Sequence, residues 1–116
     1  MKKIKVYLDM DGTIADLYNE ENWLEKLQKE DKKVFLNAKP MITEKKLKKF
    51  FPSDRYELTI LSMTPKNASK KYIANVIDQK NQWLDKYFPS ITKRIYKNYS
   101  NNKNLKNSKN AILIDD

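Results

Sequence analysis

Residues 6–14, VYLDMDGTI, contain the pattern on which the interpretation of the whole chain depends. An apolar run ends in Asp9 and Asp11, which are one residue apart and are followed by a glycine and a threonine. Residues 3–8, KIKVYL, are β-branched and aromatic and are bounded by Asp-Gly, which predicts a β-strand. Two like charges at the end of a buried strand are costly unless solvent or a cation reaches them. The pair is therefore the first candidate for a functional site.

The remaining pattern predicts helices alternating with strands. Helical spacing of apolar residues, or an N-cap before such a run, predicts helices over residues 17–27, 43–51 and 67–88. Short apolar runs predict further strands over residues 57–62, 91–96 and 111–114. Residues 98–110 are expected to form a polar loop or a short exposed helix. Continuous apolar strands are typical of burial on both faces, so we expect a single α/β domain with a parallel sheet.

The sequence contains no cysteine and no histidine. The lack of cysteine excludes disulfides and thiolate metal sites and fits a reducing compartment, so we expect a cytoplasmic protein. Without histidine, acid–base chemistry near neutral pH falls to carboxylates, lysines or metal-bound water. No apolar run approaches the roughly 20 residues that span a bilayer, and the first one is too short for a signal peptide. We therefore expect no membrane partner.

The formal net charge is +9, and lysine supplies nearly all of it, since Arg55 and Arg94 are the only arginines. Lysine lacks the planar fork with which arginine binds phosphates and bases through two parallel hydrogen bonds. A solvated lysine-rich surface is the favoured interpretation, and a dedicated nucleic-acid site is the alternative.

Five polar side chains follow predicted strands: Asp9, Asp11, Ser62, Asp115 and Asp116. In open parallel sheets, ligands bind beyond the carboxyl ends of the strands, so these groups are expected to converge on one edge. Carboxylates gathered there repel one another unless a cation is present, and oxygen ligands without histidine or cysteine favour Mg²⁺. A carboxylate beside such an ion suits phosphoryl transfer through an aspartyl-phosphate. A simple turn after the first strand and a solvated chain end stay open as alternatives.

Several phrases resemble motifs of the haloacid dehalogenase (HAD) superfamily of phosphohydrolases. DMDGT resembles the first motif, LTILSMTP resembles the second, and AILIDD is similar to the acidic fourth motif. The third motif is a lysine, for which Lys103 fits by spacing, with Lys106 and Lys109 as rivals. Within the superfamily, AKPM, ILSMTP, QWLDKYFP and ILIDD together look like the 5′(3′)-deoxyribonucleotidase-like branch. The resemblance covers nearly the whole chain and implies a three-layer Rossmann-like core with a minimal helical cap after the first strand.

The resemblance also implies roles for individual residues. Asp9 would be the nucleophile that takes the phosphoryl group, and Asp11 would be the general acid and then the base that activates water. Ser62 and Lys103 would bind phosphate oxygens, and Thr13 would support the loop and contribute to this phosphate site. Mg²⁺ would be held by the Asp9 carboxylate, the Asp11 backbone carbonyl and one of the terminal pair. Of Asp115 and Asp116, we favour Asp115.

Two features depart from the family. The sequence ends on the fourth motif, whereas the family continues with a loop and usually another strand, so it is either a piece of a longer chain or a minimal protein. The cap has room only for residues 16–40, which predicts an open site or one closed by an oligomeric partner. Three aromatic residues could stack on a base there, but packing is the favoured role: Tyr18, Trp23 and Phe35. The apolar face around Trp83 is expected in the core or against a second subunit.

The leading functional prediction is a Mg²⁺-dependent phosphomonoesterase acting on nucleotides. One alternative is a phosphatase of nucleic-acid ends, to which an open site and positive charge would contribute. The other is a catalytically weak HAD-like protein that binds a phosphorylated ligand or a partner protein.

Overall fold

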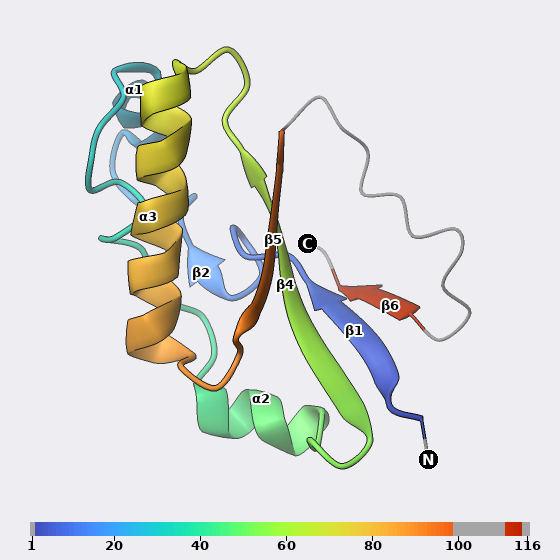
Figure 1. Cartoon of the computed structure of the whole chain (residues 1–116). Helices are drawn as coiled ribbons and strands as arrows, with labels where there is room; N and C mark the ends of the chain where they lie inside the picture. Colours follow the sequence, from blue (N-terminus) through green and yellow to red (C-terminus); the bar gives the residue numbers. More distant parts are fainter. Residues whose placement is uncertain (1, 99–110, 115–116) are drawn as a thin grey trace.

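The computed structural model describes residues 2–98 and 111–114, which form a mixed α/β structure built on a parallel sheet (Figure 1). The strands of that sheet are β1 (Ile4–Leu8), β4 (Tyr56–Thr64), β5 (Lys93–Asn98) and β6 (Ala111–Ile114). The helices are α1 (Trp23–Gln28), α2 (Glu44–Phe50) and α3 (Lys70–Tyr87). A second, antiparallel sheet consists of β2 (Ala15–Asp16) and β3 (Lys39–Pro40).

The large sheet has the strand order β5-β4-β1-β6, and all neighbouring strands are parallel. β1 lies between β4 and β6, and Leu8 stands opposite Ile60 on one side and Ile114 on the other. The predicted α/β class with a parallel sheet is therefore confirmed. Because the strands run in one direction, their carboxyl ends meet at one edge, and Asp9 and Asp11 follow β1 at that edge.

β4 is longer than the strand predicted over residues 57–62. It continues to Thr64, and Met63 stands opposite Lys97 of β5 while the Thr64 hydroxyl donates to the Lys97 carbonyl at 3.3 Å. The prediction ended the strand too early because Pro65 follows closely. Only the proline itself lacks the N–H that the ladder needs, so the two residues before it can still pair.

β5 begins two residues later than predicted because Ile91 belongs to the turn that follows α3. The Ile91 amide donates to the Phe88 carbonyl at 3.1 Å, and its side chain is buried in the core. Phe88 is the C-cap of α3, and the chain leaves the helix before Pro89, as predicted. Both apolar residues of this turn, Phe88 and Ile91, are therefore buried in the core.

The long amphipathic helix is confirmed as α3. It begins after Ser69, whose side chain accepts a hydrogen bond from the Tyr72 amide and so caps the first turn. Trp83 is 1% exposed, packs in the core cluster that contains β1 and β4 residues, and donates its indole N–H to the Ala38 carbonyl at 2.7 Å. The apolar face around Trp83 is thus covered by the chain itself, which decides the question between core and subunit interface.

The helix predicted over residues 17–27 is wrong in extent, because α1 covers only Trp23–Gln28. The chain turns before it, where the Asn19 side chain donates to the Asp16 carboxylate and Asn22 adopts a left-handed conformation with φ of 57°. Leu17 does not join a helical stripe but packs in a second cluster against α3. Apolar spacing alone could not distinguish this tight turn from a first helical turn.

Figure 1 shows α1 and α3 on the same side of the sheet, with α2 below them near the amino ends of the strands. α2 is capped by Thr43, as predicted, through a bond from the Lys46 amide. The connection from β5 to β6 lies outside the described residues, so the three-layer arrangement stays a prediction. Within the described part of the chain, no helix has the length and apolar character needed to cross a bilayer.

Candidate active site

Asp9 lies at the carboxyl edge of the sheet, directly after β1, the strand between β4 and β6. Its amide donates to the Ile114 carbonyl at 2.9 Å, so the backbone of Asp9 is fixed to the end of β6. The residue is only 9% exposed. Asp115 and Asp116, the predicted metal ligands, follow Ile114 directly in sequence but lie outside the described residues.

The loop after Asp9 is a tight turn organised by one carbonyl. The Met10 carbonyl accepts hydrogen bonds from the amides of Thr13, Ile14 and Ala15 at 3.3, 3.0 and 2.9 Å. Gly12 has φ of 81°, in the left-handed region that glycine adopts without a steric cost. The Met10 side chain is fully buried and points away from solvent, which fixes this part of the loop to the core. The loop thereby holds Asp11 close to the strand ends rather than in open solvent.

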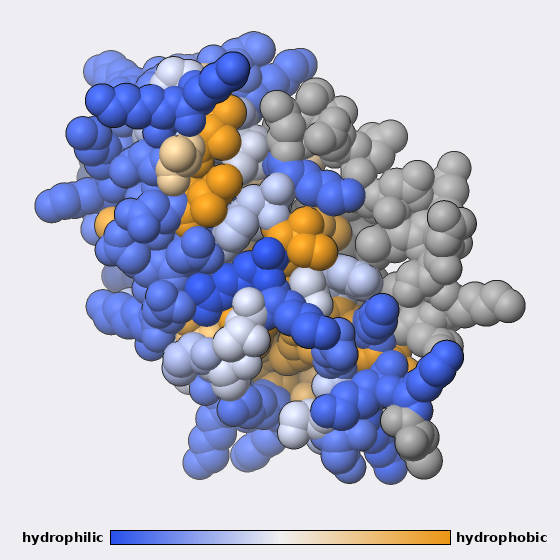
Figure 2. Space-filling view, in the orientation of Figure 1, coloured by the Kyte–Doolittle hydropathy of each residue, from blue (hydrophilic) through white to orange (hydrophobic). Residues whose placement is uncertain are grey.

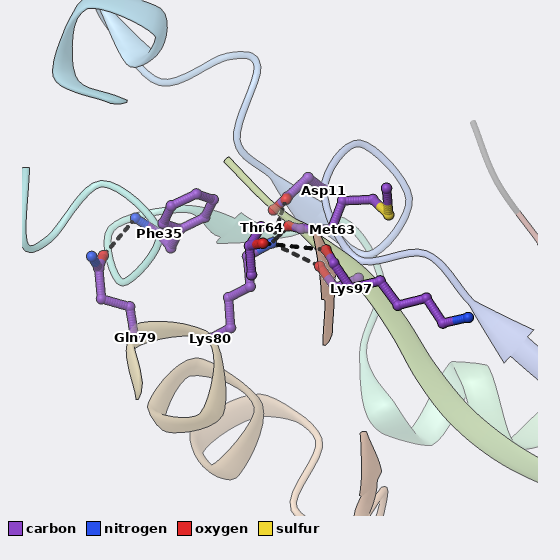
Figure 3. A network of polar contacts seen from close by, with 8 residues as sticks. Asp11, Phe35, Met63, Thr64, Gln79, Lys80 and Lys97 are labelled. Carbon is purple, nitrogen blue, oxygen red and sulfur yellow. Dashed lines mark hydrogen bonds and ion pairs between the residues drawn. The ribbon is translucent and has the colours of Figure 1, made fainter. Parts of the chain in front are cut away.

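The residue that joins the predicted site groups is Lys80 of α3, which the sequence interpretation did not single out (Figure 3). Its side chain is fully buried, and its ammonium donates to Asp11 Oδ2 at 3.0 Å, to Ser62 Oγ at 2.7 Å and to the Met63 carbonyl at 2.7 Å. An ammonium has three N–H donors, so these oxygens use all of them. Lys80 therefore links the loop after β1 to the carboxyl end of β4.

A signal for Lys80 was present in the sequence. Lys80 follows Val76 by four residues and precedes Trp83 by three, so it lies on the buried stripe of α3. A lysine within the apolar stripe of a long helix is rarely fully buried unless a carboxylate or carbonyl is there to receive it. Combined with Asp11 at a strand end, that position indicated a buried ion pair.

Ser62 lies where the sequence predicted it, at the carboxyl end of β4. It shares a sheet face with Ile60 and Thr64, the face on which α3 packs. Ser62 is fully buried and accepts from Lys80, which leaves its own hydroxyl hydrogen free to donate. The structure thus brings Ser62 to Asp11 through Lys80, while a phosphate contact of Ser62 stays a prediction.

Two buried oxygen atoms of the loop have no hydrogen-bond partner among the residues that the structure describes. They are Asp11 Oδ1 and Thr13 Oγ1. A buried polar atom without a partner costs about 1–3 kcal/mol, and more when it is charged. Groups of this kind are commonly satisfied by an ion, a water molecule or a ligand. Both atoms belong to residues that the sequence assigned to the site.

The remaining predicted site residues are three lysines and two aspartates outside the described part of the chain. Lys103, Lys106 and Lys109 lie outside the described residues, as do the two terminal aspartates. Within the part of the chain that is described, no cluster of three or more potential metal-ligating side chains occurs. Among the described residues, the candidate site thus holds two carboxyl groups, those of Asp9 and Asp11, and one ammonium, that of Lys80.

The aromatic residues of the 16–40 segment pack, as favoured from the sequence. Phe35 is 3% exposed, and its ring centroid lies 4.7 Å from the Lys80 ammonium. Trp23 is partly buried against the second cluster and meets Tyr18 edge-on, with ring centroids 4.9 Å apart. Tyr18 itself remains half exposed.

No family model matches the chain, and no curated protein matches it. The resemblance to the HAD superfamily therefore stays a prediction that rests on the quoted motifs. The chemistry of the site is argued below from its own geometry.

Proposed function

We propose that the chain is a Mg²⁺-dependent phosphomonoester hydrolase with a HAD-like core, acting through an aspartyl-phosphate on Asp9. One observation carries the proposal. A buried lysine joins Asp11 and Ser62 beside Asp9, at the carboxyl ends of adjacent parallel strands. Structural packing alone does not favour this arrangement, because apolar residues of similar volume would fill the same space without the cost of burying charges.

The charge balance of the site is consistent with a divalent cation. A phosphate monoester brings about two negative charges near neutral pH. The Asp9 carboxylate that must approach this phosphate is also negatively charged, so the two would repel each other unless a cation offset them. Carboxylate and carbonyl oxygens are the ligands that Mg²⁺ prefers, and Asp11 Oδ1 is a buried oxygen with no hydrogen-bond partner among the described residues.

The residues suited to hold the ion are the Asp9 carboxylate and the Asp11 backbone carbonyl, with Asp115 added from the sequence. When bound, Mg²⁺ would offset negative charge on the transferring group. The remaining chemistry would be done by the chain's own side chains.

In the first step, an Asp9 oxygen attacks phosphorus, and the bond from phosphorus to the ester oxygen breaks. Asp11 gives its proton to that oxygen, so the substrate leaves as an alcohol. In the second step, water attacks the phosphorus of the aspartyl-phosphate and gives a proton to Asp11. The bond from phosphorus to Asp9 then breaks, which releases phosphate and restores both carboxyl groups. Lys80 orients Asp11 throughout by holding Oδ2.

The substrate class proposed is a nucleoside monophosphate, and it rests on the branch that the motifs resemble. The base, the sugar and the phosphate position are left to experiment.

The test is phosphate release from a panel of deoxy- and ribonucleoside 5′- and 3′-monophosphates, with Mg²⁺ and with chelator. The wild-type chain and Asp9→Asn are compared, with circular dichroism to verify that both are folded. We expect Mg²⁺-dependent release that falls at least 1,000-fold in Asp9→Asn, on the order expected for loss of a nucleophile. No release from any nucleotide by the folded wild-type protein would refute the proposal.

A second candidate is a protein that binds a phosphorylated ligand without turnover. It is favoured by the contact of Lys80 Nζ with Asp11 Oδ2 at 3.0 Å, because a carboxylate oxygen held in an ion pair is not available to give a proton to a leaving group. The same variant separates the two candidates, because a binding protein would keep its affinity for the nucleotide in Asp9→Asn and would show no release in either form. Strong salt dependence on oligonucleotides but not on mononucleotides would instead indicate a phosphatase of nucleic-acid ends.

A further inference from the structure

Phe35 is held by two consecutive residues of α3. Gln79 Oε1 accepts a hydrogen bond from the Phe35 amide at 2.9 Å, while the Phe35 ring lies against the ammonium of Lys80 (Figure 3). The amide group of Gln79 has no freedom to turn, because its Nε2 donates to the Asp31 carbonyl at 3.2 Å and to Asn75 Oδ1 at 2.8 Å. The backbone of Phe35 is thus fixed relative to the residue next to Lys80.

The segment that carries Phe35 has a second anchor two helical turns earlier on α3. The Tyr72 hydroxyl donates to the same Asp31 carbonyl at 2.7 Å. Between these anchors, Val34 packs with Val76 in the second apolar cluster. Residues 31–35 are therefore fastened to α3 by hydrogen bonds at both ends of a buried apolar contact, and the ring position follows from that attachment.

Besides its three hydrogen bonds, the Lys80 ammonium has the Phe35 ring next to it, with the ring centroid at 4.7 Å. All three N–H donors of Lys80 point to Asp11, Ser62 and Met63, so another oxygen would find no donor. An aromatic face attracts a cation without needing a hydrogen, and this attraction is larger when the cation is shielded from water. Lys80 is fully buried, so its ammonium is shielded from water in this way.

We propose that Phe35 is a positioning residue of the candidate site, whose ring holds the Lys80 ammonium against Asp11. This role rests on the proposed function for its effect on turnover. It connects the segment between α1 and β3 to the reaction centre, so that movement of residues 31–35 away from α3 would release Lys80 from Asp11. The segment that covers the helix would in this way control the orientation of the general acid.

The test compares Phe35→Leu, which removes the aromatic face but keeps an apolar side chain, with Phe35→Tyr, which keeps the face. Phe51→Leu is the matched control, because Phe51 is partly buried and meets Tyr56 edge-on away from Lys80. We expect kcat to fall about tenfold in Phe35→Leu with KM within twofold, near-wild-type kcat in Phe35→Tyr, and no change in Phe51→Leu.

A second measurement does not depend on turnover. Solvent exchange of the Lys80 ammonium protons, followed by NMR with labelled lysine, should be at least tenfold faster in Phe35→Leu and unchanged in Phe51→Leu. If the wild type shows no turnover but the exchange rates differ in this way, the proposed function fails while the positioning role stands. Equal exchange in wild type and Phe35→Leu, or equal loss of kcat in Phe35→Leu and Phe51→Leu, would overturn the role.

Discussion

Two lysine–carboxylate pairs, one between β4 and β5 and one between α3 and the loop after β1, differ in exposure more than in length. Lys93 Nζ lies 2.6 Å from Glu57 Oε1 on an exposed stretch of β4 and β5, and its hydrogen bond lowers the pKa of Glu57. Lys80 Nζ lies 3.0 Å from Asp11 Oδ2, with the lysine fully buried. The shorter pair is the exposed one. Exposure to solvent, rather than length, decides how strongly each pair interacts. Water screens the charges of the exposed pair, and it screens those of the pair with the buried lysine much less.

Figure 2 colours one face of the molecule by hydropathy. The view shows hydrophilic residues over much of the molecular surface, as expected for a lysine-rich chain. On such a surface one more ion pair adds little to stability. A buried ion pair, by contrast, loses much of its electrostatic gain to desolvation, so its presence is better explained by chemistry than by stability.

The largest difference between the pairs should appear in the free energy of unfolding when each lysine is replaced by methionine. Methionine keeps the approximate length of the side chain but removes its charge. Lys80→Met leaves the Asp11 carboxylate and Ser62 without their donor, so we expect a loss of about 3–5 kcal/mol in the free energy of unfolding. Lys93→Met should leave the urea midpoint unchanged within error. Urea titrations monitored by tryptophan fluorescence measure both.

A mild effect of Lys80→Met would mean that Asp11 finds another partner or is reached by water. The contrast between buried and exposed pairs would then be wrong. Phosphate release by the two variants adds an independent measure, since only Lys80→Met should lose turnover.

The same contrast applies to two glutamines of α3. Gln79 is buried and bonds Phe35 and Asp31, whereas Gln82 is exposed and donates to Asp78 Oδ2 at 2.7 Å. Gln79→Leu should cost about 1–3 kcal/mol, because it leaves a buried amide hydrogen unsatisfied. Gln82→Leu should cost less than about 0.5 kcal/mol. Equal costs by urea titration would show that the segment 31–35 is not fastened to α3 as described.

Helix capping gives a smaller effect, away from the candidate site. Thr43→Ala removes the side-chain oxygen that accepts from the Lys46 amide, at a cost of about 1 kcal/mol in unfolding free energy. Turnover should not change, because α2 lies near the amino ends of the strands. A loss of turnover at unchanged folding would show that the two edges of the sheet are coupled.

The smallest expected effect is a loss of stability in alkaline solution that involves Tyr72 and Tyr96. Burial raises the pKa of Tyr72 and of Tyr96 from 10.0 to about 12, and for Tyr72 the Asp31 and Glu30 carboxylates add to it. Between these values the unfolded chain has lost the phenolic proton that the folded protein keeps, so stability falls as pH rises through this window. Tyr72→Phe with Tyr96→Phe should flatten the decline between pH 10 and 12, measured as unfolding midpoint against pH. An unchanged slope would contradict the burial of these hydroxyls.

Much of the fold could be predicted because each element carries its own local pattern. Continuous apolar runs predicted β1, β4 and β6, and the caps at Thr43 and the stop before Pro89 marked two helices. The candidate site was predicted in part for a similar reason, since Asp9 and Asp11 follow β1 and Ser62 lies near the carboxyl end of β4. Groups at the ends of parallel strands must meet at one edge, whatever lies between them in sequence.

What escaped prediction depends on contacts between distant segments. Lys80 stands 69 residues from Asp11, and helical spacing marks it as buried without saying against what. Phe35 meets Lys80 because residues 31–35 are attached to α3 by contacts such as the bond from the Phe35 amide to Gln79, and no local sequence pattern predicts such contacts. The predicted length of α1 was wrong because the apolar residues before it have helical spacing, although the chain there forms a turn held by Asn19 and Asp16.

The central claim is that Asp9 takes up a phosphoryl group. The most direct measurement mixes the wild-type chain with a nucleoside monophosphate carrying labelled phosphate in Mg²⁺, quenches the reaction in acid and maps the labelled peptide. The account predicts label on the peptide that contains Asp9 and none in Asp9→Asn. Phosphate release without label on that peptide, or release by Asp9→Asn at the wild-type rate, would contradict it.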